Sequence, residues 1–291
     1  IGLFKDATLN NQIINNDFRE LVYANSMFEN ALLNNCNINL TLPKCIDVSS
    51  MFKNATLINT TINLTFTCLE AFVSGFDNAI IDASSRINID FGLKGKVNCN
   101  YIFYKSNIKY DNLDNIINTS NILYADYMFA DTTENVNINK FTLDKVISAN
   151  GFIQNNSNFN SSVYNLKLTN CLYLDSAFMN CSLFDGTGLD GLLCTNLSDI
   201  DNIFKNCSSL TNSNVIKVLS KTIKTMNYSF YGVPASMNGS IILPIVETMD
   251  YAFYNCSNMN IDFNLCSFDS ATSMISAFEN CSLFNQPLSL F

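Results

Sequence analysis

Phenylalanine recurs along the chain at a nearly constant spacing, with similar apolar and polar residues around it each time. The members are Phe4, Phe28, Phe52, Phe76, Phe103, Phe129, Phe152, Phe178, Phe204, Phe230, Phe253 and Phe278. The steps between them are 24, 24, 24, 27, 26, 23, 26, 26, 26, 23 and 25 residues. A fixed period in this range is typical of a solenoid, because one unit is too small to bury its apolar face and must stack on its neighbours.

The residues just before each phenylalanine also repeat. The site four residues earlier is apolar in ten of eleven units, and the site three residues earlier is Asp, Asn or Ser in eight of twelve. Such polar side chains cap short helical turns by accepting hydrogen bonds from free N–H groups. We therefore expect each phenylalanine at the third position of a short helical or 3-10 turn. The expected capping residues are Asn25, Ser49, Asn100, Asp126, Asp175, Asp201, Asn227 and Asp250.

Short runs with strand character lie between these turns, for example residues 38–42, 61–66 and 240–246. Strands of successive coils would pair in parallel at about 4.8 Å. The pattern predicts a mainly β solenoid with leucine-rich-repeat-like stacked coils, short parallel strands and short helical or 3-10 turns. We expect a single solenoid over residues 1–291, with about twelve repeats of 23–27 residues and no cap at either end.

The aromatic ladder is predicted to be structural, because its spacing follows the repeat and not one site. No cofactor is expected from it. The chain has no histidine, which excludes acid–base and triad chemistry based on that residue. No close Cys-x-x-Cys pair is present and no histidine could complete one, so we expect no metal site. Catalytic carboxylates stay possible, but no set of them converges in the sequence, and no catalytic residue is predicted. The glycine-rich loop 185–191 could hold a cation, but a simple turn with two capping Asp residues fits its sequence better.

Composition limits the partners. Only 14 % of residues are charged, the net charge is −9, and Arg19 and Arg86 are the two arginines. Nucleic-acid binding depends on Lys and Arg to displace counterions, so no nucleic-acid partner is expected. No run approaches the roughly 18 apolar residues of a membrane span. The chain begins at Ile1 without a signal peptide, which we interpret as a processed or partial product.

The eleven cysteines are placed regularly. Cys181, Cys207, Cys256 and Cys281 each follow a repeat phenylalanine by three residues. Side chains at equivalent places on stacked coils run alongside each other, which is poor geometry for a disulfide. We therefore expect mostly free, buried thiols that behave as small apolar side chains.

Asparagine occupies 46 positions, and fourteen of them begin an Asn-x-Ser/Thr sequon. Five of these share one place in the repeat, two residues after the phenylalanine, and the total is less than twice the number that composition predicts. Sequons are acceptors for glycans in secreted proteins. The candidate glycosylation sites are Asn39, Asn54, Asn59, Asn63, Asn118, Asn155, Asn160, Asn180, Asn196, Asn206, Asn227, Asn238, Asn255 and Asn280.

Residues 277–288 read Ala-Phe-Glu-Asn-Cys-Ser-Leu-Phe-Asn-Gln-Pro-Leu, and residues 177–181, 203–207 and 252–256 repeat the first half. Residues 51–55 carry the form with Ala in place of Cys. These motifs resemble the repeat of BspA-type leucine-rich proteins and the related lipoprotein-associated surface repeats, although the chain has no Trp after its Pro-Leu. The resemblance implies a secreted or surface-displayed repeat for adhesion, binding or assembly, without catalysis.

The leading prediction is a non-enzymatic extracellular or cell-surface protein with a structural or adhesive role, glycosylated, and able to bind a protein or glycan ligand. Open coil ends could stack end to end into a filament, because a head-to-tail contact that does not close generates fibres. The alternative is an intracellular or surface scaffold that binds a partner protein on its concave face. A polysaccharide-active β-helix enzyme is disfavoured by the two arginines and the missing histidine.

Overall fold

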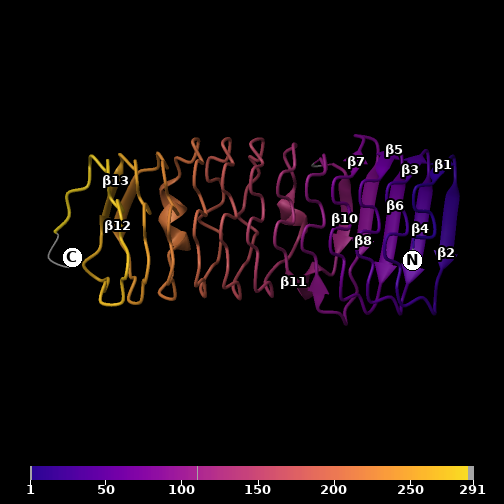
Figure 1. The fold of residues 1–291 in the computed structure, drawn as a ribbon, viewed down its shortest axis with the longest axis horizontal. Helices are drawn as coiled ribbons and strands as arrows, with labels where there is room; N and C mark the ends of the chain where they lie inside the picture. The colour runs from indigo at the N-terminus through magenta and orange to yellow at the C-terminus, as the bar shows by residue number, and fades with distance from the viewer. Residues whose placement is uncertain (1, 110, 288–291) are drawn as a thin grey trace. The chain divides into compact units, whose positions relative to one another are not determined.

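The computed structural model describes residues 2–109 and 111–287. The chain divides into two compact units, Ile1–Lys145 and Val146–Phe291. Within each unit the backbone winds in successive coils, and every strand pair is parallel (Figure 1). The predicted parallel β solenoid is therefore confirmed, while a single array over residues 1–291 stays a prediction. Ile1, and Leu288 at the end of the quoted motif, lie outside the described residues.

The described residues of the first unit form three parallel sheets. The first, in the order β1-β3-β5-β7, contains β1 (Thr8–Asn10), β3 (Leu32–Asn34), β5 (Thr56–Ile58) and β7 (Ile80–Ile81). The second, in the order β10-β8-β6-β4-β2, contains β2 (Ile13–Asp17), β4 (Asn37–Leu42), β6 (Thr61–Phe66), β8 (Arg86–Asp90) and β10 (Leu113–Ile117). The third pairs β9 (Val97–Asn98) with β11 (Ile122–Tyr124). The strand alternation puts one row of side chains in the core, as Ile38 beside Ile62 shows.

The second unit has fewer regular strands. Only β12 (Met237–Ser240) and β13 (Met259–Asp262) form a sheet there among the described residues, and single parallel bridges link most of its coils. The strand expected over 240–246 shares only Ser240 with β12, so that prediction is wrong. Pro244 lies in this segment and has no N–H to donate to a ladder.

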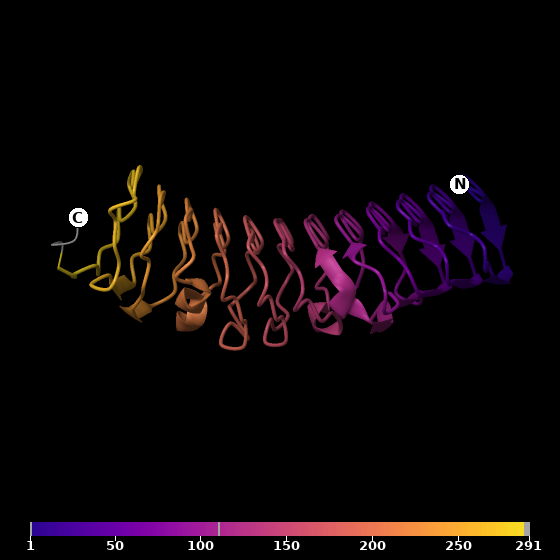
Figure 2. The ribbon, with the colours of Figure 1, turned by 90° about the horizontal axis from the view of Figure 1, so that it is seen from below.

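Helical structure is restricted to three short 3-10 helices in the described part of the chain. They are η1 (Thr119–Asn121), η2 (Ile138–Lys140) and η3 (Ser213–Val218). In Figure 2, η3 is the orange coiled ribbon. None of the three coincides with a phenylalanine turn. Those turns use hydrogen bonds from residue i+3 to residue i, such as Ala55 N–H to the Phe52 oxygen at 3.0 Å. The alternate N–H groups, such as that of Phe52, donate instead to the next coil.

Phenylalanine rings stack from coil to coil in each unit. Centroid distances are 5.1 Å for Phe28 and Phe52 and 4.9 Å for Phe52 and Phe76. In the second unit, the rings of Phe230 and Phe253 are 5.1 Å apart and only 1° from parallel. Offset stacking of this kind stabilises a core beyond the burial of apolar area. The rings therefore fix the coil-to-coil register as well as filling the interior.

Phe152 departs from the expected ladder. Ile153 donates its N–H to the Ala177 oxygen at 2.8 Å, just as Phe178 donates to the Ile203 oxygen at 3.0 Å. Ile153 therefore occupies the ladder position, and Phe152 lies one residue early, where Ala177 lies in the next coil. Both side chains are buried. The expected ladder residue at 152 is thus replaced by Ile153.

In the second unit, the expected capping residues accept hydrogen bonds from the next coil instead of from their own turns. Asp175 accepts a hydrogen bond at its Oδ1 from the Asp201 N–H, 3.0 Å away in the next coil. Asp201 accepts in the same way from Asn227 at 2.7 Å, and Asn227 accepts from Asp250 at 2.8 Å. The residue type was expected correctly, but the partner is one coil further along because stacking brings that N–H within reach.

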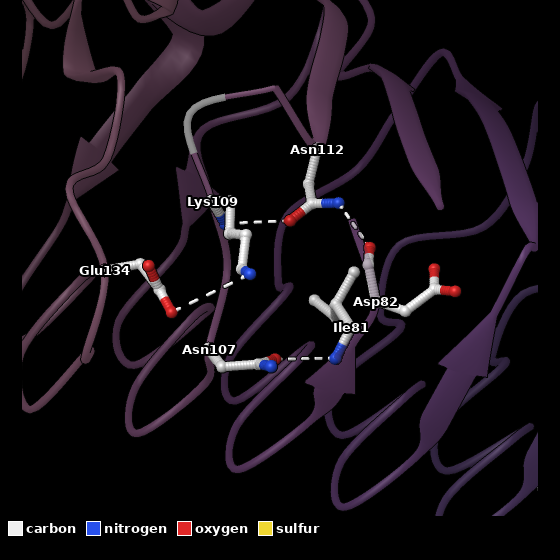
Figure 3. A network of polar contacts seen from close by, with 6 residues as sticks. All are labelled: Ile81, Asp82, Asn107, Lys109, Asn112 and Glu134. Atoms are coloured by element: carbon white, nitrogen blue, oxygen red, sulfur yellow. Dashed lines mark hydrogen bonds and ion pairs between the residues drawn. The ribbon is translucent and has the colours of Figure 1, made fainter. Parts of the chain in front are cut away.

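The first sheet ends at β7, where side chains replace the missing strand (Figure 3). The Ile81 N–H donates to Asn107 Oδ1 at 2.6 Å. Asn112 donates from Nδ2 to the Asp82 oxygen at 2.8 Å and accepts from the Lys109 N–H at 2.8 Å. Asn112 is 1 % exposed, so this amide satisfies backbone groups that would otherwise be buried without partners.

Candidate interaction surface

Each coil turns through a fixed backbone pattern that we call the turn edge. We call the repeat phenylalanine of each coil, or Ile153 in its coil, the ladder residue. The turn edge consists of the residues two before, one after and two after this ladder residue. In all twelve coils the residues two before and two after it have positive φ. This left-handed conformation lets successive amides point alternately along the stack and across the turn, and Gly, Asn and Asp adopt it most readily. The side chains of the turn edge are held outward on this backbone.

Asparagine side chains form a hydrogen-bonded ladder two residues after the ladder residue. Asn54 donates from Nδ2 to Asn30 Oδ1 at 2.9 Å in the first unit. Asn206 donates to Asn180 at 2.8 Å in the second unit, and Asn180 donates to Asn155 at 2.7 Å. Each internal rung thus uses one donor and one acceptor of its amide. The ladder explains part of the high Asn content, since Asn both tolerates positive φ and pairs with its own kind.

Four turn edges carry tyrosine at the first left-handed position. These residues are Tyr101, Tyr127, Tyr228 and Tyr251, with φ of 61°, 54°, 56° and 54°. Most other coils have Gly, Ser or Asn there. A bulky side chain at positive φ is uncommon and costs about 1–3 kcal/mol. The four residues form two pairs in consecutive coils, whose ring centroids are 5.0 and 4.9 Å apart.

The second unit places four tyrosines together, which we call the tyrosine platform: Tyr228, Tyr231, Tyr251 and Tyr254. Tyr231 stacks on Tyr254 at 4.9 Å and 9°. Lys205 closes one end, with its Nζ 4.2 Å from the centroid of Tyr228 and 5.7 Å from that of Tyr231. Glu279 follows on the other side, and its negative charge raises the pKa of Tyr254. Each ring has one face against a neighbouring tyrosine, and Lys205 lies over Tyr228, so ring edges and hydroxyls remain for a partner.

A smaller cluster of the same design lies in the first unit. Tyr101 stacks on Tyr127 and meets Tyr104 edge to face at 5.4 Å. The Lys105 Nζ lies 5.0 Å from the Tyr104 centroid. Burial raises the pKa of both Tyr101 and Tyr104. Each unit therefore combines stacked tyrosines with a lysine on its turn edge.

The structure assigns the fourteen candidate glycosylation sites to different surroundings. Because Ile153 is the ladder residue, Asn155 joins Asn54, Asn180, Asn206, Asn255 and Asn280 in the asparagine ladder. Asn39 and Asn63 lie in β4 and β6, where Asn63 donates to Asn39 at 2.5 Å. Asn227 is the most constrained, since it donates to Asp201 and Thr248 and accepts from Asp250. The other sites are Asn59, Asn118, Asn160, Asn196 and Asn238, of which Asn118 is half-buried and the rest are exposed.

All eleven cysteines are free thiols, and all are buried except the half-buried Cys68 and Cys281. Cys207 and Cys256 donate from Sγ to the backbone oxygens of Phe178 and Phe230 in the preceding coil, at 2.9 and 2.8 Å. Burial raises the pKa of Cys207 to about 12 and that of Cys281 to about 11. These thiols are therefore protonated packing elements near neutral pH.

The other candidate chemistry is unremarkable in its geometry. Asp185, at the start of the glycine-rich loop, accepts hydrogen bonds from the N–H and hydroxyl of Thr187 at 2.8 and 2.6 Å, which closes a turn. Across 2–109 and 111–287, no three or more Cys, Asp or Glu side chains gather as metal ligands. The same residues contain no helix with the length and apolar character that a bilayer span requires.

The comparisons with known proteins give one result. No curated protein and no solved structure matches the chain. A family model described as "Mycoplasma protein of unknown function, DUF285" matches residues 2–67, 97–218, 124–243 and 195–291. The last three matched segments overlap one another, as expected when one model can be placed on a repeat in several registers. The likeness to BspA-type repeats remains a prediction, and the match over most of the sequence shows that the chain belongs to the DUF285 family.

Proposed function

We propose that the protein is a non-enzymatic binding protein of the cell surface or extracellular space, which holds a partner protein at the tyrosine platform. The observation that carries this proposal is the placement of Tyr228 and Tyr251 in a conformation that favours Asn and Gly. A sequence selected only for stability would have little reason to accept that cost at two consecutive coils. Selection for a surface contact provides the reason.

The platform has the properties of a binding hot spot. Tyrosine is enriched at protein interfaces because its ring offers a large contact area and its hydroxyl a hydrogen bond. Here the four rings are already stacked, and Lys205 holds one end of the stack. Ordering side chains on binding costs about 0.5–1.5 kcal/mol each. Much of that cost is absent because the rings are held in place before the partner arrives.

Ring orientation favours a protein partner over a neutral sugar. Sugars pack on exposed aromatic faces, whereas the faces of Tyr228 and Tyr251 lie 4.9 Å apart against each other. Ring edges carry partial positive charge, and phenol hydroxyls donate hydrogen bonds. The Lys205 ammonium adds a positive charge at one end. The platform therefore suits a partner surface rich in backbone carbonyls and carboxylates.

The binding test compares wild-type protein with the Y228S/Y251S double variant on immobilised extracellular-matrix proteins, with neutral glycans beside them. Serine is the residue of several other coils at this position, for example Ser50 and Ser176, so the fold should tolerate it. The control is Tyr164→Ser, because Tyr164 is 57 % exposed and lies outside the turn edge. We expect protein binding that weakens about tenfold or more in the double variant, as for a hot spot of at least about 1.4 kcal/mol. Absence of protein binding, or equal binding by both variants, contradicts the proposal.

The surface location is supported by the exposed sequons and by the repeat motifs. A membrane-impermeant amine label applied to intact cells should modify the protein before lysis, and labelling only after lysis would favour the intracellular scaffold. Intact-mass measurement with and without a glycosidase tests the glycans. We also propose that coils of different molecules stack end to end. Electron microscopy should then show filaments rather than dispersed particles.

A further inference from the structure

The second unit contains a basic segment in an acidic protein. No Asp or Glu occurs between Asp201 and Glu247, while four lysines do: Lys205, Lys217, Lys221 and Lys224. The whole chain carries a net charge of −9. A local excess of positive charge against this background is a feature that packing does not require, since Lys217 and Lys221 are exposed.

Among the described residues, three of these four lysines form no ion pair, and the exception is Lys224. Lys205 lies over the tyrosine platform, and the Lys224 Nζ is 3.8 Å from Glu247 Oε1. Within the part of the chain that the structure describes, no ion pair involves Lys217 or Lys221. Unpaired ammonium groups attract an anion, and they do so more strongly beside a concave wall of low dielectric constant.

Lys217 and Lys221 line two adjoining hollows between η3 and β12. The first has a volume of about 440 Å³ and is lined by Ser213, Asn214, Ile216, Lys217, Ser236 and Asn238. The second, of about 320 Å³, shares Ile216 and Lys217 with the first and adds Lys221. Both volumes lie within the range of about 300–1,000 Å³ that small-molecule sites occupy. They exceed what one simple anion needs.

We propose that these hollows bind an acidic saccharide. Lys217, which both hollows share, holds the carboxylate or sulfate together with Lys221. Asn214, Ser236 and Asn238 offer amides and hydroxyls for hydrogen bonds to the sugar hydroxyls. These groups match a ligand that carries many hydroxyls and one or more negative charges.

The remaining lining residues agree with this assignment. Ile216 is half-buried and Ile242 is 37 % exposed at the second hollow, which offers apolar contact for the C–H face of a sugar ring. Among the described residues, Asp262 is the one acid bonded to a lining residue, and it accepts from the Ser240 hydroxyl at 2.8 Å. The anion is therefore placed toward Lys217 rather than toward Ser240. This site shares no residue with the tyrosine platform, so the saccharide proposal and the proposed function can be tested independently.

The test is calorimetric titration of the full chain with three hexasaccharides: one sulfated, one carboxylated and one neutral. The chain is produced in bacteria, so that Asn238 carries no glycan. We expect the sulfated and carboxylated sugars to bind and the neutral sugar to bind at least about tenfold more weakly, because the neutral sugar forms no charge-assisted hydrogen bond with the lysines. The K217Q/K221Q variant should lose about tenfold or more for both acidic sugars.

The matched control is Lys224→Gln. This substitution removes one positive charge from the same segment, and Lys224 lines neither hollow. The K224Q substitution should change the affinity for the acidic sugars by less than about twofold. A larger change would mean that unspecific attraction to the basic segment explains the binding. Equal losses in K224Q and K217Q/K221Q overturn the proposal. So does sodium sulfate that competes as well, mole for mole, as the sulfated hexasaccharide, since the hydroxyl contacts would then contribute nothing. Failure of wild-type protein to bind either acidic sugar also overturns it.

Discussion

Asn180 and Asn155, in adjacent coils of the second unit, are joined by a hydrogen bond of 2.7 Å from Nδ2 to Oδ1. Asn180 also accepts from Asn206 at 2.8 Å, and its φ is 61°. One side chain thus meets two requirements: a left-handed backbone and a polar rung between coils. These requirements can be separated by mutation.

Replacing Asn180 with alanine should destabilise the protein by about 1–2 kcal/mol, because alanine resists the left-handed conformation and removes both rungs. Asn180→Gly removes the same rungs but adopts positive φ freely, so it should cost less. Urea denaturation of the two variants measures the difference. If glycine proves as costly as alanine, the backbone conformation is not what selects asparagine here.

Replacing Phe204 with alanine should cost about 3–5 kcal/mol, because Phe204 is fully buried and its ring stacks 5.5 Å from that of Phe178. Phe204→Leu should cost less, since it leaves a smaller cavity. The control is Leu183→Ala, because Leu183 is 50 % exposed. Thermal and urea unfolding measure the stability of all three variants. If Leu183→Ala lowers stability as much as Phe204→Ala, a core role for the phenylalanine ladder is contradicted.

Stability should fall at alkaline pH. Burial raises the pKa of Cys207 to about 12, and it raises those of Cys99, Cys194 and Cys256 as well. A thiol with a raised folded pKa stabilises the fold below its unfolded pKa, about 8.5, and loses that contribution as pH rises through the folded value. The urea midpoint of unfolding should therefore be lower at pH 10 than at pH 7.5.

The C207A/C256A variant should show a smaller loss of stability between those two pH values, since it removes two of the titrating thiols. Alanine occupies the same place in other coils, at Ala31, Ala55 and Ala79, so the variant should fold. An unchanged pH slope would show that other groups cause the alkaline loss.

In the native protein, Cys281 and Cys256 should react slowly with an aromatic disulfide reagent at pH 8. Burial raises the pKa of Cys281 to about 11, so only about one thiol in a thousand is ionised there. Cys256 is fully buried and should react more slowly still. All eleven cysteines should react once the protein is unfolded in guanidinium. Rapid reaction of Cys256 in native protein would contradict the described packing.

Acid should weaken the end of the first sheet through Asp82. Desolvation raises the pKa of this carboxyl, but hydrogen bonds from Ser85, Ser84 and the Asn59 N–H outweigh it and leave the pKa below its usual value. Stability from a lowered carboxyl pKa is present above the unfolded pKa and is lost as pH falls through the folded value. Asp82→Asn should lower stability at pH 6 more than at pH 3, as measured by urea unfolding. Equal losses at both pH values would show that the charge is not involved.

The solenoid could be predicted from sequence because its period is repeated in every coil. The spacing of phenylalanines does not identify the ladder residue in the coil of Phe152, since Phe152 and Ile153 are both apolar and both buried. The better signal is the pair of left-handed residues, Gly151 and Asn155, which flank Ile153 at the same offsets as in other coils. A rule based on backbone conformation would have found the correct register where a rule based on ring type did not.

The capping prediction failed for a related reason. A single sequence shows which residues are near each other along the chain, but not which residues lie next to each other in stacked coils. It therefore predicts that Asp175 and Asp201 cap their own turns, whereas Asp175 accepts from the next coil. The tyrosine platform was missed although its signal was present. Tyr228 and Tyr251 precede their ladder phenylalanines by two residues, and Tyr231 and Tyr254 follow them by one. Only the stacking distance shows that this recurrence creates a surface.

Under the proposed function, the turn edge separates recognition from folding. The residue two before the ladder residue has positive φ in all twelve coils, whether it is Ser50, Asn202 or Tyr228. Exchange at these outward positions should therefore change what the molecule recognises while leaving its interior undisturbed. A family built on this coil can diversify its specificity by point mutation alone, without insertions and without renewed selection for a foldable scaffold.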